Sequence, residues 1–272
     1  MTEALLPKKV RTSHLAEFKK AGQKFSCLTS YDSITAGIFD EAGIEVILVG
    51  DSAADNALGY TTTLPITVDE MIPFGRAVAG AVARGLVVVD MPFGSYEVSA
   101  EQALENAIRI MKVTGADAVK LEGGVRSISQ IEALTTAGIP VMAHIGFTPQ
   151  SVNNLGGFKV QGRGEGADEL MADAMAVSSA GAFAVVLELV PAELAKLVTQ
   201  ECGIPTIGIG AGPDTDGQIL VWTDFAGLSS HKPKKFVKQY AQLRTTLVQA
   251  AREYRSDISE GIFPGDDRSF GA

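Results

Sequence analysis

Six charged or titratable side chains stand within or directly after short apolar runs of this sequence. They are Asp51, Asp90, Lys120, Glu122, His144 and Glu188. Four of the six are carboxylates, and burying that many like charges together is costly unless a cation or a reaction uses them. Carboxylates without a cluster of histidine and cysteine favour a hard, oxygen-bound cation such as Mg²⁺ over Zn²⁺. The set therefore indicates a metal site with acid–base chemistry.

Each of these residues also has a plain structural explanation when it is considered alone. An aspartate after a strand is often the N-cap of the next helix, and this applies equally to Asp51 and Asp90. Lys120 could pair with a carboxylate for structure only, and His144 could be a buried core histidine. As a set, Asp51 and Asp90 are the best candidates for direct metal ligands, and Glu122 could bind directly or through a water.

These side chains can meet only if the apolar runs are strands of one sheet. The runs are Phe25–Ser30, Val46–Asp51, Leu86–Met91, Ala118–Gly123, Val141–Gly146, Ala184–Val190, Pro205–Gly210 and Gln218–Trp222. Most are continuously apolar, which is typical of a parallel sheet covered on both faces, and eight strands close a (β/α)₈ barrel. The loops at the strand C-termini build the active site of such barrels, so we expect the charged residues at one rim.

Segments of helical periodicity lie between the expected strands. They include Glu101–Thr114, Asp168–Ala180, Pro191–Glu201 and Pro233–Tyr254. Two connections are long, Ala53–Thr67 and the glycine-rich Phe147–Gly166. The second is typical of an active-site lid, and a disordered surface excursion is the alternative. The sequence predicts one barrel domain over residues 1–272, with short N-terminal and C-terminal extensions.

The composition argues against several classes of partner. The net charge of -9 and the pI near 4.9 oppose binding to nucleic acid, because an acidic surface repels phosphates. Cys27 and Cys202 are far apart and in no metal or redox spacing, so they are expected to be reduced, buried thiols. The first twelve residues lack the apolar block of a signal peptide, and we expect no membrane span and a cytoplasmic location.

Several stretches around these residues carry a resemblance to a known family. They are Gly50–Ser52, Thr62–Thr67, Val89–Phe93, Val119–Gly124, His144–Ser151, Lys159–Gly164, Leu187–Pro191, Gly208–Gly212 and Thr215–Val221. Together they are similar to ketopantoate hydroxymethyltransferase, also called 3-methyl-2-oxobutanoate hydroxymethyltransferase. The resemblance runs from about Arg11 to Phe270, and the block from His144 to Gly164 is highly specific.

The resemblance implies a fold, a reaction and an assembly. The fold would be a (β/α)₈ barrel of the phosphoenolpyruvate/pyruvate-type superfamily, with one Mg²⁺ per subunit. The reaction would move a hydroxymethyl group from 5,10-methylenetetrahydrofolate to 2-oxoisovalerate, giving ketopantoate through a metal-stabilised enolate. This is the first step of pantothenate synthesis, which feeds coenzyme A. The assembly would be a homo-oligomer, a decamer in known members.

The resemblance also implies roles for individual residues. Asp51 and Asp90 match metal ligands that also contact the substrate, and Glu122 matches the third metal-associated carboxylate. Ser52 and Lys120 match positions that hold the carboxylate of the oxo acid. His144 matches a substrate-binding histidine. Glu188 matches the catalytic base that would take the C3 proton.

Two alternatives and one departure from the family pattern stay open at this stage. After Gly50–Ser52 the family usually continues Leu-Gly-Met, where this chain has Ala53-Ala54-Asp55. The nearest alternative function is a Mg²⁺-dependent 2-oxo-acid C–C lyase or mutase on the same barrel. Lyases of that kind usually carry a Lys-Lys-Cys-Gly-His stretch, which this sequence lacks. A non-catalytic barrel that only binds or assembles is the second alternative, and the intact set of site residues argues against it.

Overall fold

Eight parallel strands close into a barrel in the computed structural model of this protein, which describes residues 7–230 and 232–271. They are β1 Phe25–Thr29, β2 Val46–Val49, β3 Leu86–Asp90, β4 Ala118–Glu122, β5 Val141–Gly146, β6 Ala184–Glu188, β7 Thr206–Ile209 and β8 Gly217–Leu220. Because β8 pairs with both β7 and β1, the sheet leaves no free edge. The predicted (β/α)₈ barrel is confirmed, and its eighth strand lies within two residues of the predicted ends.

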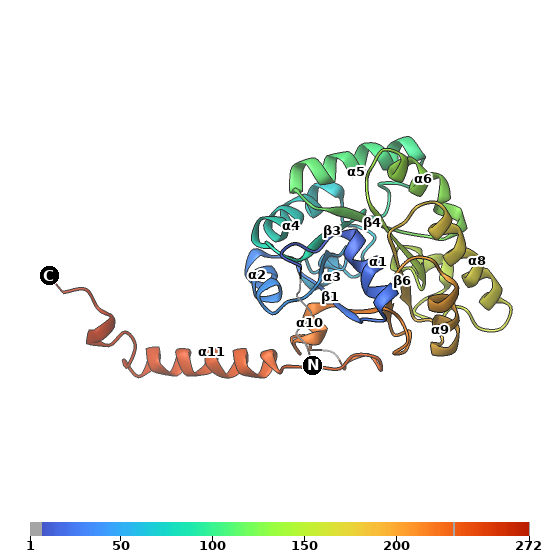
Figure 1. Ribbon diagram of the computed structural model, residues 1–272. Coiled ribbons are helices and arrows are strands. Elements are labelled where there is room, and N and C mark those ends of the chain that lie inside the picture. The colour runs from blue at the N-terminus through green and yellow to red at the C-terminus, as the bar shows by residue number, and fades with distance from the viewer. Residues whose placement is uncertain (1–6, 231, 272) are drawn as a thin grey trace. The chain divides into compact units, whose positions relative to one another are not determined.

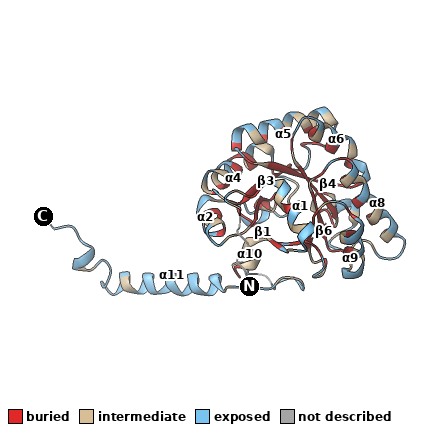
Figure 2. Cartoon of the chain, viewed as in Figure 1, coloured by how far each residue is buried: buried red, intermediate tan, exposed pale blue. Residues whose placement is uncertain are grey.

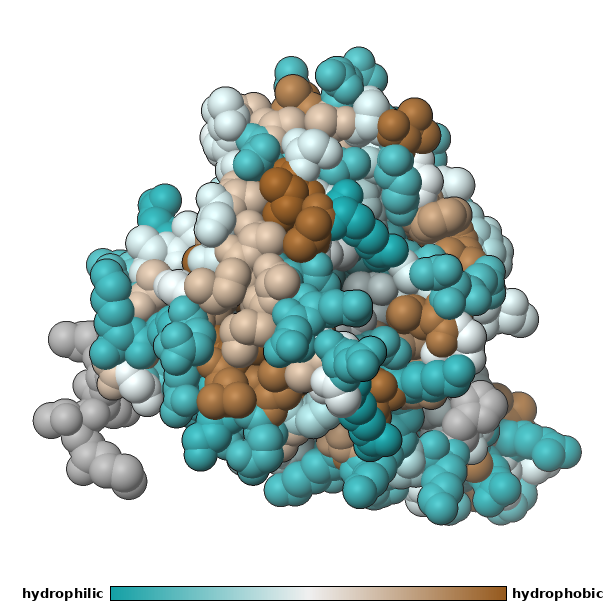
Figure 3. Space-filling model, turned by 90° about the vertical axis from the view of Figure 1, so that its right-hand side faces the viewer, coloured by the Kyte–Doolittle hydropathy of each residue, from teal (hydrophilic) through white to brown (hydrophobic). Residues whose placement is uncertain are grey.

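Helices follow the strands and surround them, as Figure 1 shows. The outer helices are α2 Ser33–Glu41, α4 Val68–Ala81, α5 Ala100–Thr114, α6 Ile128–Thr136, α8 Gly166–Ser179 and α9 Ala192–Glu201. Their starts follow local chemistry: the Asp32 carboxylate caps α2, and Thr67 and Glu70 form a capping box at α4. Figure 2 shows buried strands and helices whose outer faces are exposed. On the face drawn in Figure 3, hydrophobic residues form small groups among hydrophilic ones.

The connections on the barrel carry short helical turns. These are α3 Ala53–Asn56, η1 Val125–Ser127, η2 Pro149–Ser151 and α7 Val152–Leu155. The predicted long loop after β5 therefore contains two turns of helix, and α8 begins at its last residue, Gly166. The stretch Ala53-Ala54-Asp55, which departs from the family pattern, forms the start of α3 with both alanines fully buried.

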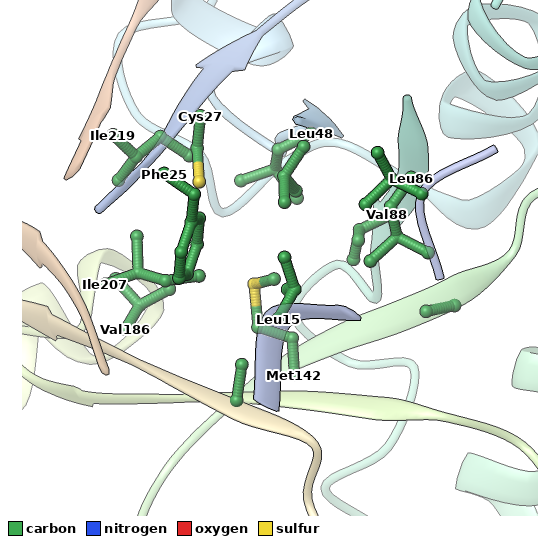
Figure 4. Close-up of a cluster of buried hydrophobic side chains, with 14 residues drawn as sticks. Leu15, Phe25, Cys27, Leu48, Leu86, Val88, Met142, Val186, Ile207 and Ile219 are labelled. Atoms are coloured by element: carbon green, nitrogen blue, oxygen red, sulfur yellow. The ribbon is translucent and has the colours of Figure 1, made fainter. Parts of the chain in front are cut away.

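The N-terminal end of the barrel is filled by apolar side chains. Helix α1, Thr12–Ala21, crosses this end and inserts Leu15, which is fully buried, among side chains from the strands. Figure 4 shows Leu15 beside Met142, with Leu48, Leu86, Val88 and Phe25 around them. This cluster also contains Cys27. Since one end of the barrel is a packed core, a site can open only at the C-terminal ends of the strands.

Strand alternation carries the polar residues to that open end. Successive side chains of a strand point to opposite faces, so every second residue enters the barrel. On β3 this series runs Leu86, Val88, Asp90; the first two lie in the core cluster and the third stands above them. The same rule takes β5 from Met142 to His144. One inward series per strand therefore supplies both the core and the site.

The chain divides into two compact units, Met1–Val221 and Trp222–Ala272. The first contains the whole barrel, and the second contains α10 Trp222–Phe225, α11 Leu243–Ser259 and η3 Asp266–Arg268. The prediction of one domain with a short C-terminal extension stays a prediction. The predicted helix Pro233–Tyr254 is wrong over residues 233–242, because several lysines crowd that stretch and the apolar helical stripe begins only at Leu243.

Cys27 and Cys202 are free and buried, as predicted. None of the helices within the described residues is long and apolar enough to cross a bilayer.

Candidate active site

Asp90, Lys120 and Asp51 form one buried group at the C-terminal end of the barrel. Asp90 and Lys120 are register partners on β3 and β4, and the Lys120 ammonium lies 2.5 Å from Asp90 Oδ1. The other carboxylate oxygen of Asp90 accepts a hydrogen bond from the Asp51 backbone N–H at 3.0 Å. Asp51 directly follows Gly50 at the end of β2, so its position is tied to Asp90 through the backbone. All three are at least 96% buried.

Glu122, His144 and Glu188 form a second buried group beside the first. Glu122 and His144 are register partners on β4 and β5, and Nδ1 of the imidazole lies 3.3 Å from Glu122 Oε1. On the other side, Nε2 lies 3.4 Å from Glu188 Oε2. Among the described residues, neither imidazole nitrogen nor Glu122 Oε1 has a hydrogen bond of good geometry. The imidazole thus stands between two carboxylates at ion-pair distance.

Gln150 joins the two groups, and the sequence had not predicted it as a site residue. Its side-chain nitrogen donates to Asp51 Oδ2 at 2.9 Å, and its backbone N–H donates to Glu122 Oε2 at 3.0 Å. Ser52 is tied to the site separately: its hydroxyl lies 2.7 Å from the hydroxyl of Tyr31, which was also missed. Gln150 and Tyr31 do not belong to the strand residues that point into the barrel, so the alternation of side chains along the strands could not predict them.

Burial and mutual repulsion shape the titration of these groups. Burial first, and then the charges of Asp90 and Glu122, raise the pKa of Asp51 to about 8. Burial and Lys120 oppose protonation of His144, but Glu122 and Glu188 outweigh them and raise its pKa to about 9. The neighbouring carboxylates likewise outweigh burial at Lys120 and hold its pKa above the ordinary value. The site therefore carries more negative charge than its own cations neutralise.

The donor set fits a hard cation, although it is not a complete cage. Within residues 7–230 and 232–271, no group of three or more His, Cys, Asp or Glu side chains is arranged to hold a metal ion alone. Mg²⁺ does not require one, because it usually takes one or two protein carboxylates and completes its octahedron with water or substrate. The buried Asp51–Asp90 pair offers such ligands, and Glu122, which is linked to Asp51 through Gln150, has an Oε1 that accepts no hydrogen bond among the described residues.

A glycine after β5 allows the chain to approach the Glu188 backbone closely. Gly146 is the register partner of Glu188 and has φ 88°. A Cβ at this position would lie 2.4 Å from the Glu188 carbonyl oxygen, which also accepts the Phe147 N–H at 2.8 Å. Any larger residue must therefore move the end of β6 that carries Glu188.

We expect Gly146→Ala to lower kcat about 100-fold, since a shift of about 1 Å in a catalytic group has a cost of that order. Gly138→Ala is the matched control, because Gly138 has a similar φ of 82° but nothing within 4 Å of the added Cβ. Both variants carry comparable backbone strain, but only Gly146→Ala adds the clash, so thermal unfolding should show the larger loss for Gly146→Ala. Equal activity of the two variants would contradict the importance of this close approach.

The fold and the site together define a class of protein. Solved structures with similar chains include a phosphonopyruvate hydrolase in complex with oxalate and Mg²⁺, at TM-score 0.61 and 15% identity, covering 97% of this chain and 92% of that one. A 2,3-dimethylmalate lyase matches at TM-score 0.58 and 17% identity, covering 96% and 91%. That lyase is a member of the PEP mutase/isocitrate lyase superfamily. At this identity the likeness shows the fold alone, a closed parallel barrel surrounded by helices.

The family follows from closer relatives. The family model described as ketopantoate hydroxymethyltransferase matches residues 9–266, and this chain belongs to that family. The 3-methyl-2-oxobutanoate hydroxymethyltransferase of Leifsonia xyli subsp. xyli is 60% identical over 97% of this chain and 95% of its own length. The enzyme of that name from Mycobacterium tuberculosis H37Rv is 58% identical, over 96% and 93%. The chain is therefore an enzyme of the transferase class.

Proposed function

We propose that this enzyme transfers a hydroxymethyl group from 5,10-methylenetetrahydrofolate to 2-oxoisovalerate, giving ketopantoate in the first step of pantothenate synthesis. The observation that carries the proposal is the unbroken chain of buried contacts from Asp51 through Gln150, Glu122 and His144 to Glu188. It joins an oxygen-rich cation site to a carboxylate that can act as a base. The names of the relatives support the substrates.

One Mg²⁺ per subunit would bind Asp51 and Asp90, with Glu122 binding it directly or through a water. When bound, the cation would supply positive charge that acidifies C3 of the oxo acid. Ser52, Lys120 and His144 would contact the substrate. Lys120 lies against Asp90. Its positive charge would therefore offset the negative charge of a substrate carboxylate bound beside Asp51 and Asp90.

Glu188 would take the proton from C3 of the oxo acid. The electron pair left on C3 would form the new bond to the folate methylene carbon. Both bonds from that carbon to the folate nitrogens break, and a water supplies the hydroxyl oxygen of the product. The two nitrogens take up the proton from C3 and one proton from the water. His144 lies 3.4 Å from Glu188, so the imidazole can orient the carboxylate of the base.

The product assay tests this function. Purified protein with Mg²⁺, 2-oxoisovalerate and methylenetetrahydrofolate should form ketopantoate, detected by its mass, and chelation of the metal should stop the reaction. Cleavage of a 2-oxo-acid precursor such as 2,3-dimethylmalate, without ketopantoate formation, would instead favour the lyase alternative that the shared fold allows. No turnover of either kind would favour the non-catalytic barrel.

We expect Mg²⁺ binding to release protons below about pH 8, because the metal must displace the proton that Asp51 holds with its raised pKa of about 8. Without metal, folded Asp51 binds a proton that the unfolded chain has lost above about pH 4, so stability should fall as pH rises from about 4 to 8. His144, with its pKa raised to about 9, adds a loss in the same direction from about pH 6.5 upwards. Calorimetry in buffers of different ionisation enthalpy measures the release, and none at pH 6.5 would contradict it.

A homo-oligomer, a decamer in the form that the resemblance implies, remains part of this proposal. Helix α11 has no buried residue, and one of its faces carries Leu243, Leu247, Tyr254 and Ile258. An exposed apolar stripe of this kind is typical of a subunit interface. A cytoplasmic location is likewise proposed, as the sequence predicted.

We expect Leu247→Glu to dissociate the oligomer, because it places a charge on the apolar face of α11, where Leu247 is 57% exposed. Thr245→Glu is the control, since it adds the same side chain on the opposite face of the helix. Light scattering after size exclusion reports the mass of each variant. An unchanged mass for Leu247→Glu would remove this face from the interface.

A further inference from the structure

Every polar group of the Gln150 side chain has a buried partner at the cation site. Its nitrogen donates to Asp51 Oδ2 at 2.9 Å and to the Met91 carbonyl at 3.0 Å. Its oxygen accepts a 2.5 Å hydrogen bond from the Tyr96 hydroxyl. Its backbone N–H donates to Glu122 Oε2 at 3.0 Å. Gln150 is 5% exposed, so these bonds are shielded from water.

The orientation of this amide is determined by its neighbours. The Met91 carbonyl can only accept, so the amide nitrogen must face it, and the amide oxygen must then face Tyr96. Tyr96 is itself held in place, because its oxygen accepts the Glu122 backbone N–H at 3.2 Å. The donor side of Gln150 is therefore fixed toward Asp51.

We propose that Gln150 is a positioning residue, which holds Asp51 and Glu122 in the orientation that divalent-cation binding needs. The inference rests on the proposed function and names a part that the sequence resemblance did not assign. Gln150 reaches one carboxylate through its side chain and the other through its backbone, so one residue of η2 sets the spacing between the ends of β2 and β4. The hydrogen bond to Oδ2 limits the orientations of the Asp51 carboxylate, which suits the strict octahedron of Mg²⁺.

The test compares two buried glutamines that contact the same segment. Gln150→Met removes the contact with Asp51, and Gln130→Met removes a similar amide that donates to the Tyr96 carbonyl at 3.2 Å. Gln130 is 8% exposed, so the losses of packing are comparable. Mn²⁺ binding to each full-length protein without substrates is followed by the electron paramagnetic resonance of the free ion. We expect binding about 10–100-fold weaker in Gln150→Met and unchanged in Gln130→Met.

Activity gives a second readout that a merely structural role would not move. The Mg²⁺ concentration for half-maximal exchange of the C3 proton of 2-oxoisovalerate with deuterated solvent should rise in Gln150→Met and stay unchanged in Gln130→Met. Thermal unfolding in chelator should show similar losses for both glutamine variants. Equal Mn²⁺ affinity in Gln150→Met and the unaltered protein would overturn the inference.

A milder variant keeps the test decisive if Gln150→Met does not fold. Tyr96→Phe removes the hydroxyl that donates to the amide oxygen and accepts the Glu122 backbone N–H, so it should weaken Mn²⁺ binding in the same direction. Unchanged affinity in Tyr96→Phe would then overturn the inference. Failure of the unaltered protein to bind Mn²⁺ is a different outcome, because it would overturn the proposed metal site itself and this inference with it.

Discussion

Replacing Glu188 by Gln is expected to slow exchange of the C3 proton of 2-oxoisovalerate with deuterated solvent by at least about 100-fold, the usual contribution of a general base. The amide keeps the shape of the side chain at the end of β6 but cannot accept the proton. Mg²⁺ and the oxo acid should still bind, because Asp51 and Asp90 are untouched. Proton nuclear magnetic resonance follows the exchange without folate, and calorimetry follows binding.

A buried carboxylate outside the site provides the control for this variant. Glu45 lies at the start of β2 and accepts two hydrogen bonds from Ser26. Glu45→Gln should therefore leave the exchange rate unchanged. If Glu188→Gln exchanged at the original rate, another group would have to be the base. If it lost oxo-acid binding as well, Glu188 would be a binding residue.

Replacing Lys120 by Met is expected to destabilise the metal-free protein by about 3–5 kcal/mol near pH 8, the usual cost of leaving a buried charge without its partner. Lys120 lies 2.5 Å from Asp90, and both side chains are at most 5% exposed. Mg²⁺ should restore more stability to the variant than to the unaltered protein, since the added cation replaces the missing charge. Thermal unfolding with and without Mg²⁺ measures the difference.

Lys19 offers a matched ion pair away from the site. Its ammonium lies 2.9 Å from Asp216, and it joins α1 to the segment before β8. Lys19→Met should also lose stability, but Mg²⁺ should not compensate for that loss beyond its effect on the unaltered protein. Equal Mg²⁺ stabilisation of both variants would show that Lys120 does not share its surroundings with a cation.

The fold could be predicted because it follows from a few features of the sequence. Continuous apolar runs, helical segments between them and a count of eight indicate a parallel barrel. Once β3 and β4 are paired, alternation makes Asp90 and Lys120 neighbours without further information. The same holds for Glu122 beside His144. Strand periodicity thus accounts for most of the candidate site.

The parts of the site that the sequence did not predict lie in loops, where side chains follow no strand or helix periodicity. Gln150 lies on a 3₁₀ turn after β5, and Tyr96 lies in the connection after β3. Their hydrogen bond spans 54 positions of the chain, so no local pattern signals it. Likewise, the start of α11 was not predicted. Residues 233–242 carry several lysines that oppose a helix, and the apolar stripe of α11 begins only at Leu243.

The shared fold and the family carry different information about chemistry. The hydrolase and the lyase with this barrel are 15% and 17% identical to the chain, so they do not choose between transfer and cleavage. The relatives at 58–60% identity favour transfer. The transfer and cleavage hypotheses share one proposed physical basis, a cation held among carboxylates at the open end of the barrel.

A crystal structure of the protein with Mg²⁺ and 2-oxoisovalerate tests that basis most directly. We expect one cation bonded to Asp51 and Asp90 and chelated by the oxo acid, with C3 facing the Glu188 carboxylate. A cation bound elsewhere, or an oxo acid whose C3 points away from Glu188, would contradict this expectation.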